Sequence, residues 1–207
     1  MSGDKTQARR NRVRHWARTA WWFGAVCVAA MSSGMAHAVA AQNPSAATTV
    51  IVVRHAEKAA EPAADPPLTA AGVARAKALA EALKDAGVSA IITTQLERTR
   101  ATARPIADAL HITPQVVPTE TPVSEHAKHV AAAVMKHAGG VVLVVGHSNT
   151  VGEIVAALGA PKPGAICDDE YDGLYVVVIP GGGAPAHVVK GRYGAATPVA
   201  AGCGAMR

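Results

Sequence analysis

Aromatic residues and an excess of charge are both missing from most of this chain. Three Trp, three Tyr and one Phe make up 3% of its 207 residues. The net charge of +5 originates in the first forty residues, which hold six basic residues and one acidic residue, whereas the remainder holds 14 basic and 14 acidic residues. Because nucleic-acid binding relies on basic surfaces and on aromatic rings that stack on bases, this composition argues against it.

Cysteine and metal-binding patterns are also sparse. The chain contains no H-E-x-x-H sequence and no Cys/His quartet, so we expect no metal and no other cofactor. Beyond residue 40 the cysteines are Cys167 and Cys203. In an oxidising compartment these two are candidates for a disulfide that ties the C-terminal tail to the domain. Two free thiols are the alternative, because a disulfide requires Cα atoms that lie close together.

The first forty residues predict a secretory signal peptide. An arginine-rich start precedes the apolar stretch 20–31, and small residues at Ala36, Ala38 and Ala40 allow cleavage after Ala38 or after Ala40. The apolar stretch is too short, and wrongly flanked, for a stable membrane span, although an uncleaved anchor is the alternative. We therefore expect a signal peptide at 1–40, a linker at 41–47 and one domain at 48–207, located in the periplasm or secreted.

The residues after 47 alternate between patterns typical of strands and of helices. Apolar, often β-branched runs predict strands at 48–53, 89–93, 112–117 and 141–145, followed by a hairpin of 175–179 and 187–190. Helical spacing predicts helices at 69–86, 96–110, 124–137 and 149–158, with a kink or break at Pro105. This alternation predicts an α/β three-layer sandwich, with a largely parallel central sheet and helices on both faces.

Three of these predicted strands are followed by residues suited to a phosphate group. The first strand leads into Arg54 and His55, and Arg98 follows the second strand near the start of a helix. The fourth strand leads into His147 and Ser148. The carboxyl ends of parallel strands share one edge of a sheet, where ligands collect. Since arginine binds phosphate through its planar fork and histidine can act as a nucleophile, we expect a phosphate site that contains its own nucleophile.

These segments resemble the motifs of the histidine phosphatase superfamily, also called phosphoglycerate-mutase-like, and they occur in the family's order. The motifs are Arg54-His55-Ala56-Glu57-Lys58, Thr94-Gln95-Leu96-Glu97-Arg98 and Val145-Gly146-His147-Ser148. The resemblance spans about residues 48–158. It implies a phosphatase in which His55 becomes a phosphohistidine and in which Arg54, Arg98 and His147 hold the phosphoryl group, with Ser148 beside them. The expected substrate is a small or tethered phosphate monoester.

The general acid that would protonate the leaving group is less evident. The resemblance implies a carboxylate after the third predicted strand, where Glu120 is the first candidate and Glu125 the second, with Asp65 and Glu153 as further alternatives. A chain without a good acid would favour substrates whose leaving group needs little protonation, such as acyl phosphates or phosphohistidine.

Two other functions fit part of the sequence. Residues 146–150, Gly-His-Ser-Asn-Thr, approach the G-x-S-x-G pattern of a serine esterase built on Ser148, and Asp172 and His187 follow in the order of a catalytic triad. However, Thr150 stands where this pattern requires glycine, and an esterase leaves the two arginines unexplained. The other alternative is a catalytically silent module that retains the phosphate pocket.

Overall fold

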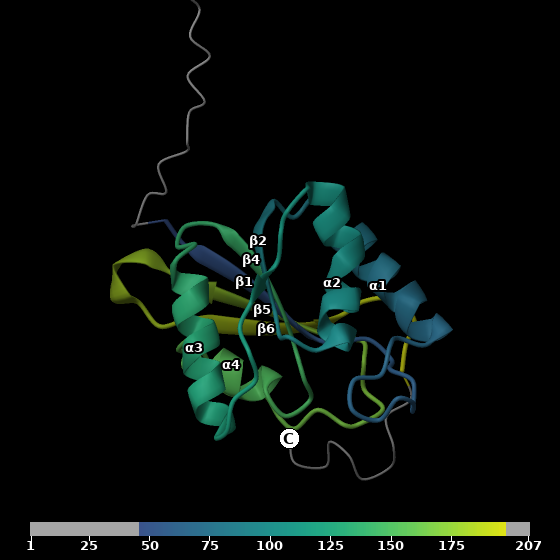
Figure 1. Cartoon of the computed structure of the whole chain (residues 1–207). Helices are drawn as coiled ribbons and strands as arrows, with labels where there is room; N and C mark the ends of the chain where they lie inside the picture. The colour runs from purple at the N-terminus through teal and green to yellow at the C-terminus, as the bar shows by residue number, and fades with distance from the viewer. Residues whose placement is uncertain (1–45, 198–207) are drawn as a thin grey trace, which may run out of the picture. The chain divides into compact units, whose positions relative to one another are not determined.

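The computed structural model describes residues 46–197, which lie within one compact unit (Figure 1). The predicted signal peptide and most of the predicted linker lie outside the described residues, as does Cys203. Within residues 46–197, no helix has both the length and the apolar character needed to cross a membrane.

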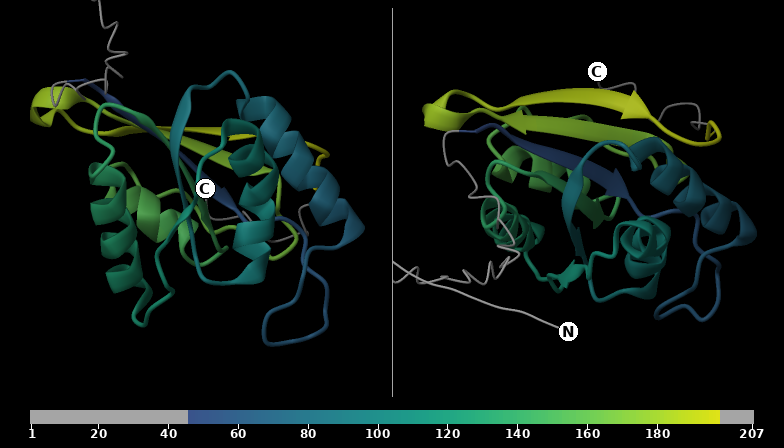
Figure 2. Two further views of the ribbon diagram at one scale, coloured as in Figure 1. Left: turned by 45° about the horizontal axis from the view of Figure 1, so that its top comes forward. Right: turned by 90° about the horizontal axis from the view of Figure 1, so that it is seen from above.

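A mixed sheet of six strands forms the centre of this unit (Figure 1). The strands are β1 Thr48–Arg54, β2 Val88–Thr93, β3 Gln115–Val116, β4 Val141–Gly146, β5 Gly173–Ile179 and β6 His187–Arg192. They follow one another across the sheet in the order β3-β2-β4-β1-β5-β6. β3, β2, β4 and β1 are parallel, whereas β5 and β6 form an antiparallel hairpin beside β1 (Figure 2). The apolar strand β4 lies inside the sheet, and the predicted hairpin is confirmed.

Helices cover both faces of the sheet, as expected for a three-layer α/β sandwich. The helices are α1 Ala70–Leu83, α2 Glu97–Leu110, α3 Val123–Met135 and α4 Val151–Ala157. Side chains on β1 alternate between the two faces, as the period of a strand requires. Ile51 belongs to a core cluster with Leu79 of α1 and Ile106 of α2, whereas Val52 belongs to a cluster with residues of α3 and α4. β1 is buried on both faces, which explains the uninterrupted apolar run at residues 50–53.

Most predicted elements differ from the observed ones by one to three residues at an end, and three differences have a local physical cause. β3 is much shorter than the predicted strand at 112–117, because Pro114 and Pro118 flank it and proline has no N–H to extend a ladder. α2 continues through Pro105, so the break allowed for there does not occur. α4 begins two residues later than predicted, because Thr150 folds back and its hydroxyl accepts a hydrogen bond from His147 N at 2.9 Å.

Candidate active site

Strand pairing brings His55 and His147 together. β1 and β4 are parallel neighbours, and their last residues, Arg54 and Gly146, are in register. The next residue on each strand is a histidine, and His55 N donates to the carbonyl of Gly146 at 2.9 Å. The two imidazole rings lie with their centroids 5.4 Å apart in an edge-to-face arrangement. The predicted convergence of these two strand ends therefore occurs in the structure.

The His55 ring is held in one orientation and in its neutral form. Its Nδ1 lies 2.8 Å from the carbonyl oxygen of Ala56, and because a carbonyl only accepts, Nδ1 is the donor and the lone pair is on Nε2. Burial lowers the pKa of His55 to about 4, and the nearby charges of Arg54, Arg98 and Lys58 act in the same direction, against the effect of the Ala56 hydrogen bond. A neutral imidazole with a free lone pair is a nucleophile.

Arg54 is fixed by the loop that precedes β5. Its Nη1 donates to the carbonyls of Cys167 at 2.7 Å and Glu170 at 3.1 Å, and its guanidinium lies 4.1 Å from the centre of the Tyr171 ring. Its Nε is buried and has no hydrogen-bond partner within residues 46–197. An N–H that points at no protein acceptor is available to an anion.

Arg98 enters the same pocket from the second residue of α2. Its Nη1 lies 3.9 Å from the carboxylate of Asp65, and its buried Nε also has no partner among the described residues. Asp65 itself accepts from the backbone N of Glu97 at 2.9 Å, so it caps the start of α2 from the loop after β1. This contact explains how a residue in a proline-rich loop contributes to the placement of Arg98.

His147 is buried beside the hydroxyl of Thr94, which follows β2. Its Nε2 lies 3.2 Å from Thr94 Oγ1, and that hydroxyl lies 2.9 Å from Thr99 Oγ1. Burial lowers the pKa of His147 to about 3, and the neighbouring His55 and Arg98 add to this effect. Both histidines are therefore neutral near pH 7, and the permanent positive charge of the site comes from its arginines and Lys58.

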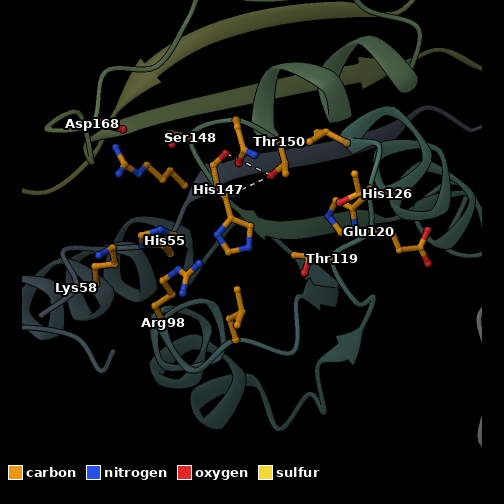
Figure 3. Close-up of a pocket in the computed structure, with 15 residues that line it drawn as sticks. His55, Lys58, Arg98, Thr119, Glu120, His126, His147, Ser148, Thr150 and Asp168 are labelled. Atoms are coloured by element: carbon orange, nitrogen blue, oxygen red, sulfur yellow. Dashed lines mark hydrogen bonds between the residues drawn. The ribbon is translucent and has the colours of Figure 1, made fainter. Parts of the chain in front are cut away.

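These side chains line one pocket with a volume of about 420 Å³ (Figure 3). The predicted residues Arg54, His55, Arg98, His147, Ser148 and Glu120 are all part of its wall. The sequence did not identify Lys58, Thr119, His126 and Asp168, which also line it. For His126 a signal was present, since it lies four residues before Val130 and eight before Val134 on the buried face of α3.

The four carboxylates considered as general acid are all engaged in contacts away from His55. The Glu120 carboxylate accepts from exposed His129 Nδ1 at 2.8 Å and points away from the two central histidines in Figure 3. Glu125 pairs with Lys128 at 2.8 Å and Glu153 with Lys162 at 2.6 Å, while Asp65 caps α2. The proposal that Glu120 is the acid stays a prediction, and this geometry does not favour it.

The three residues of the esterase alternative do not form a catalytic triad in the structure. Ser148 lines the pocket at the carboxyl end of β4, but the carboxylate of Asp172 accepts hydrogen bonds from Arg192 and Thr197. His187 is paired with Val178, whose other neighbour is Thr49 at the amino end of β1. His187 and Ser148 therefore lie at opposite ends of the sheet, too far apart for proton transfer.

The comparisons with known proteins agree with this geometry. The family model of the histidine phosphatase superfamily (branch 1) matches residues 50–120. The resemblance to the histidine phosphatase superfamily is confirmed. The matched segment contains Arg54, His55 and Arg98, whereas His147 lies beyond it and is placed by the pairing of β1 with β4.

Solved structures of phosphatases share the fold. The protein histidine phosphatase SixA, solved with tungstate, is 21% identical, with a TM-score of 0.54 over 70% of this chain and 95% of its own. A protein from Nakamurella multipartitia assigned as a SixA phosphohistidine phosphatase is 25% identical, with a TM-score of 0.52 over 74% of this chain and 100% of its own. A mycobacterial glucosyl-3-phosphoglycerate phosphatase is 14% identical, with a TM-score of 0.52 over 72% and 100%. No curated protein sequence matches the chain significantly.

Of the two cysteines in the predicted disulfide, the structure describes only Cys167. Cys167 is buried in the loop that holds Arg54 and is a disulfide-bonded cysteine. Because Cys203 lies outside the described residues, the pairing of Cys167 with Cys203 stays a prediction. Within residues 46–197, no cluster of three or more His, Cys, Asp or Glu side chains could hold a metal ion.

Proposed function

We propose that the protein is an exported phosphatase that hydrolyses phosphate monoesters, phosphohistidine or acyl phosphates through a phosphohistidine intermediate on His55. The observation that carries this proposal is the state of the His55 ring. It is buried, neutral and fixed by the Ala56 carbonyl, with its Nε2 lone pair free beside two arginines.

The reaction follows from these positions. The Nε2 lone pair of His55 forms the bond to phosphorus while the bond from phosphorus to the leaving oxygen or nitrogen breaks, and the leaving atom keeps that electron pair. Arg54 and Arg98 balance the charge on the phosphoryl oxygens, and the His147 ring offers a further polar contact. Water then attacks phosphorus, the N–P bond breaks, and inorganic phosphate leaves.

The substrate class is supported by the comparisons and by the pocket. SixA is described as a protein histidine phosphatase, and the match to this chain covers 95% of the SixA chain. A nitrogen leaving group of a phosphohistidine, or the carboxylate of an acyl phosphate, needs less protonation than an alkoxide. The hydrogen bonds that engage Glu120 and the other carboxylates fit such substrates.

The decisive experiment compares wild type with His55→Ala on a panel of phosphate compounds in the presence of a chelator. We expect turnover and an acid-labile phosphoenzyme in wild type, and loss of both in His55→Ala. Arg54→Ala and Arg98→Ala should each weaken inhibition by vanadate at least about tenfold, because charged hydrogen bonds to an anion are lost. Exposed Lys128→Ala is the control. Near-normal turnover by His55→Ala would overturn the proposal.

A catalytically silent phosphate-binding module remains the second candidate, because the Glu120 carboxylate is engaged by His129. Such a module would bind vanadate and phosphate through Arg54 and Arg98 but would turn over no member of the panel and would form no phosphoenzyme. The same experiment therefore separates the two functions.

A further inference from the structure

His126 is a buried titratable side chain that the proposed mechanism does not use. It lies on the first turn of α3, only 1% of its surface is exposed, and its ring lines the same pocket as His55 and His147. Its Nε2 is buried and has no hydrogen-bond partner within the part of the chain that the structure describes. Since buried polar atoms in folded proteins are normally satisfied, this nitrogen calls for a partner supplied from outside the chain.

The other ring nitrogen is fixed to the pocket wall. His126 Nδ1 lies 2.9 Å from the carbonyl oxygen of Pro118, and because a carbonyl only accepts, Nδ1 carries a proton. In the neutral ring the lone pair is therefore on Nε2, which can take up a proton and release it again.

The wall that anchors His126 is itself fixed to the sheet. Val117 N donates to the Thr93 carbonyl at 2.8 Å, and the side-chain amide of Gln95 makes two hydrogen bonds of 2.9 Å with Thr119. Gln95 follows β2, three residues before Arg98. The imidazole of His126 is thus held in place relative to the arginine that enters the pocket from α2.

The position of His126 relative to His55 suits the leaving-group side of the reaction. In Figure 3, His55 and His126 lie on opposite sides of His147. An in-line displacement places the leaving atom on the side of phosphorus opposite the attacking nitrogen. If the phosphoryl group lies beside His147, a leaving group that departs away from His55 is directed toward the part of the wall that holds His126.

We propose that His126 Nε2 transfers the proton to and from the leaving-group side of the phosphoryl group, in the role that a carboxylate would otherwise have. In the first step, the imidazolium form gives its Nε2 proton to the leaving oxygen as the P–O bond breaks, and the ring becomes neutral. In the second step, Nε2 takes a proton from the attacking water as the N–P bond to His55 breaks, which restores the imidazolium. This inference rests on the proposed phosphatase function.

The test uses a variant that keeps the anchor and removes the proton carrier. In His126→Asn, the side-chain amide N–H replaces Nδ1–H and can still donate to the Pro118 carbonyl, whereas no titratable nitrogen remains. We expect His126→Asn to lower kcat/KM for an alkyl phosphate by about 10²–10⁴-fold, and for p-nitrophenyl phosphate by less than about tenfold, because nitrophenolate leaves without protonation. With p-nitrophenyl phosphate the variant should also show a burst and accumulate acid-labile phosphoenzyme, since the water step loses its base.

Glu120→Gln is the competing variant, and thermal unfolding of each protein verifies that it is folded. An equal fall in kcat/KM for both substrates in His126→Asn, or a leaving-group effect on kcat/KM in Glu120→Gln that is absent in His126→Asn, would overturn the inference. If His126→Asn does not fold, His126→Gln on the same two substrates decides by the same criteria. Loss of turnover in His55→Ala together with an unaffected His126→Asn would refute the role of His126 alone. Turnover by His55→Ala would instead refute the proposed function.

Discussion

At the scale of single residues, the site depends on a histidine that folding keeps uncharged. Burial and the charges of Arg54, Arg98 and Lys58 all disfavour a proton on His55, and together they bring its pKa to about 4. A free imidazole has an ordinary pKa near 6.5, so about a quarter of it would be protonated, and unable to attack, at pH 7. In the proposed mechanism, the arginines that bind the phosphoryl group therefore also act together with burial to keep His55 in its neutral, reactive form.

This electrostatic arrangement predicts an NMR titration. Without ligand, the ring signals of His55 and His147 should stay at their neutral positions from about pH 8 down to about pH 5, and His55 should change only as the pH falls toward 4. The spectrum of His55→Ala identifies the His55 signal by its loss. A His55 midpoint near its ordinary value would mean that the pocket is more hydrated than its geometry implies.

At the scale of elements, the sequence predicted which strand ends meet better than it predicted where the elements begin and end. Buried apolar runs identified β1 and β4, and residues that end parallel strands must share a sheet edge, so His55 and His147 were placed correctly. Glu120 was judged from chain position alone, and His126 was not identified. Which of them faces the pocket depends on how the segment between β3 and α3 turns, and contacts such as Gln95 with Thr119 decide this only in three dimensions.

A threonine joins two of these elements and can be tested. Thr102 of α2 accepts from Ala56 N at 2.9 Å and donates to the Arg98 carbonyl at 2.7 Å, so it links the exit of β1 to the helix that carries Arg98. Thr102→Val keeps the shape but leaves Ala56 N unsatisfied. We expect a loss of about 1–3 kcal/mol in the free energy of unfolding by urea, together with a lower kcat.

Thr102→Ser retains the hydroxyl and is the matched control for that substitution. It should recover most of the kcat and of the stability, apart from the small loss that follows removal of a buried methyl group. If Thr102→Val unfolds at the same urea concentration as wild type, the hydroxyl does not hold the two elements together.

At the scale of the whole molecule, charge divides the chain into two parts. The sequence pI of about 9.3 describes all 207 residues, yet the residues after 40 carry equal numbers of basic and acidic side chains. A basic start followed by an apolar stretch and small residues is typical of an export signal. On this interpretation the positive charge serves targeting and is removed, and the domain that remains is close to neutral.

Export predicts a processed protein with a defined new N-terminus. Expressed in a Gram-negative host, the chain should appear in the periplasmic fraction, and its intact mass should correspond to cleavage after Ala38 or Ala40. Ala38 occupies position −1 of the first site and −3 of the second, so Ala38→Arg should block both. Ala36→Arg should block only cleavage after Ala38, and Ala40→Arg only cleavage after Ala40. Recovery of the full-length chain in the cytoplasm, with its N-terminus intact in wild type, would show that residues 1–40 have a different role.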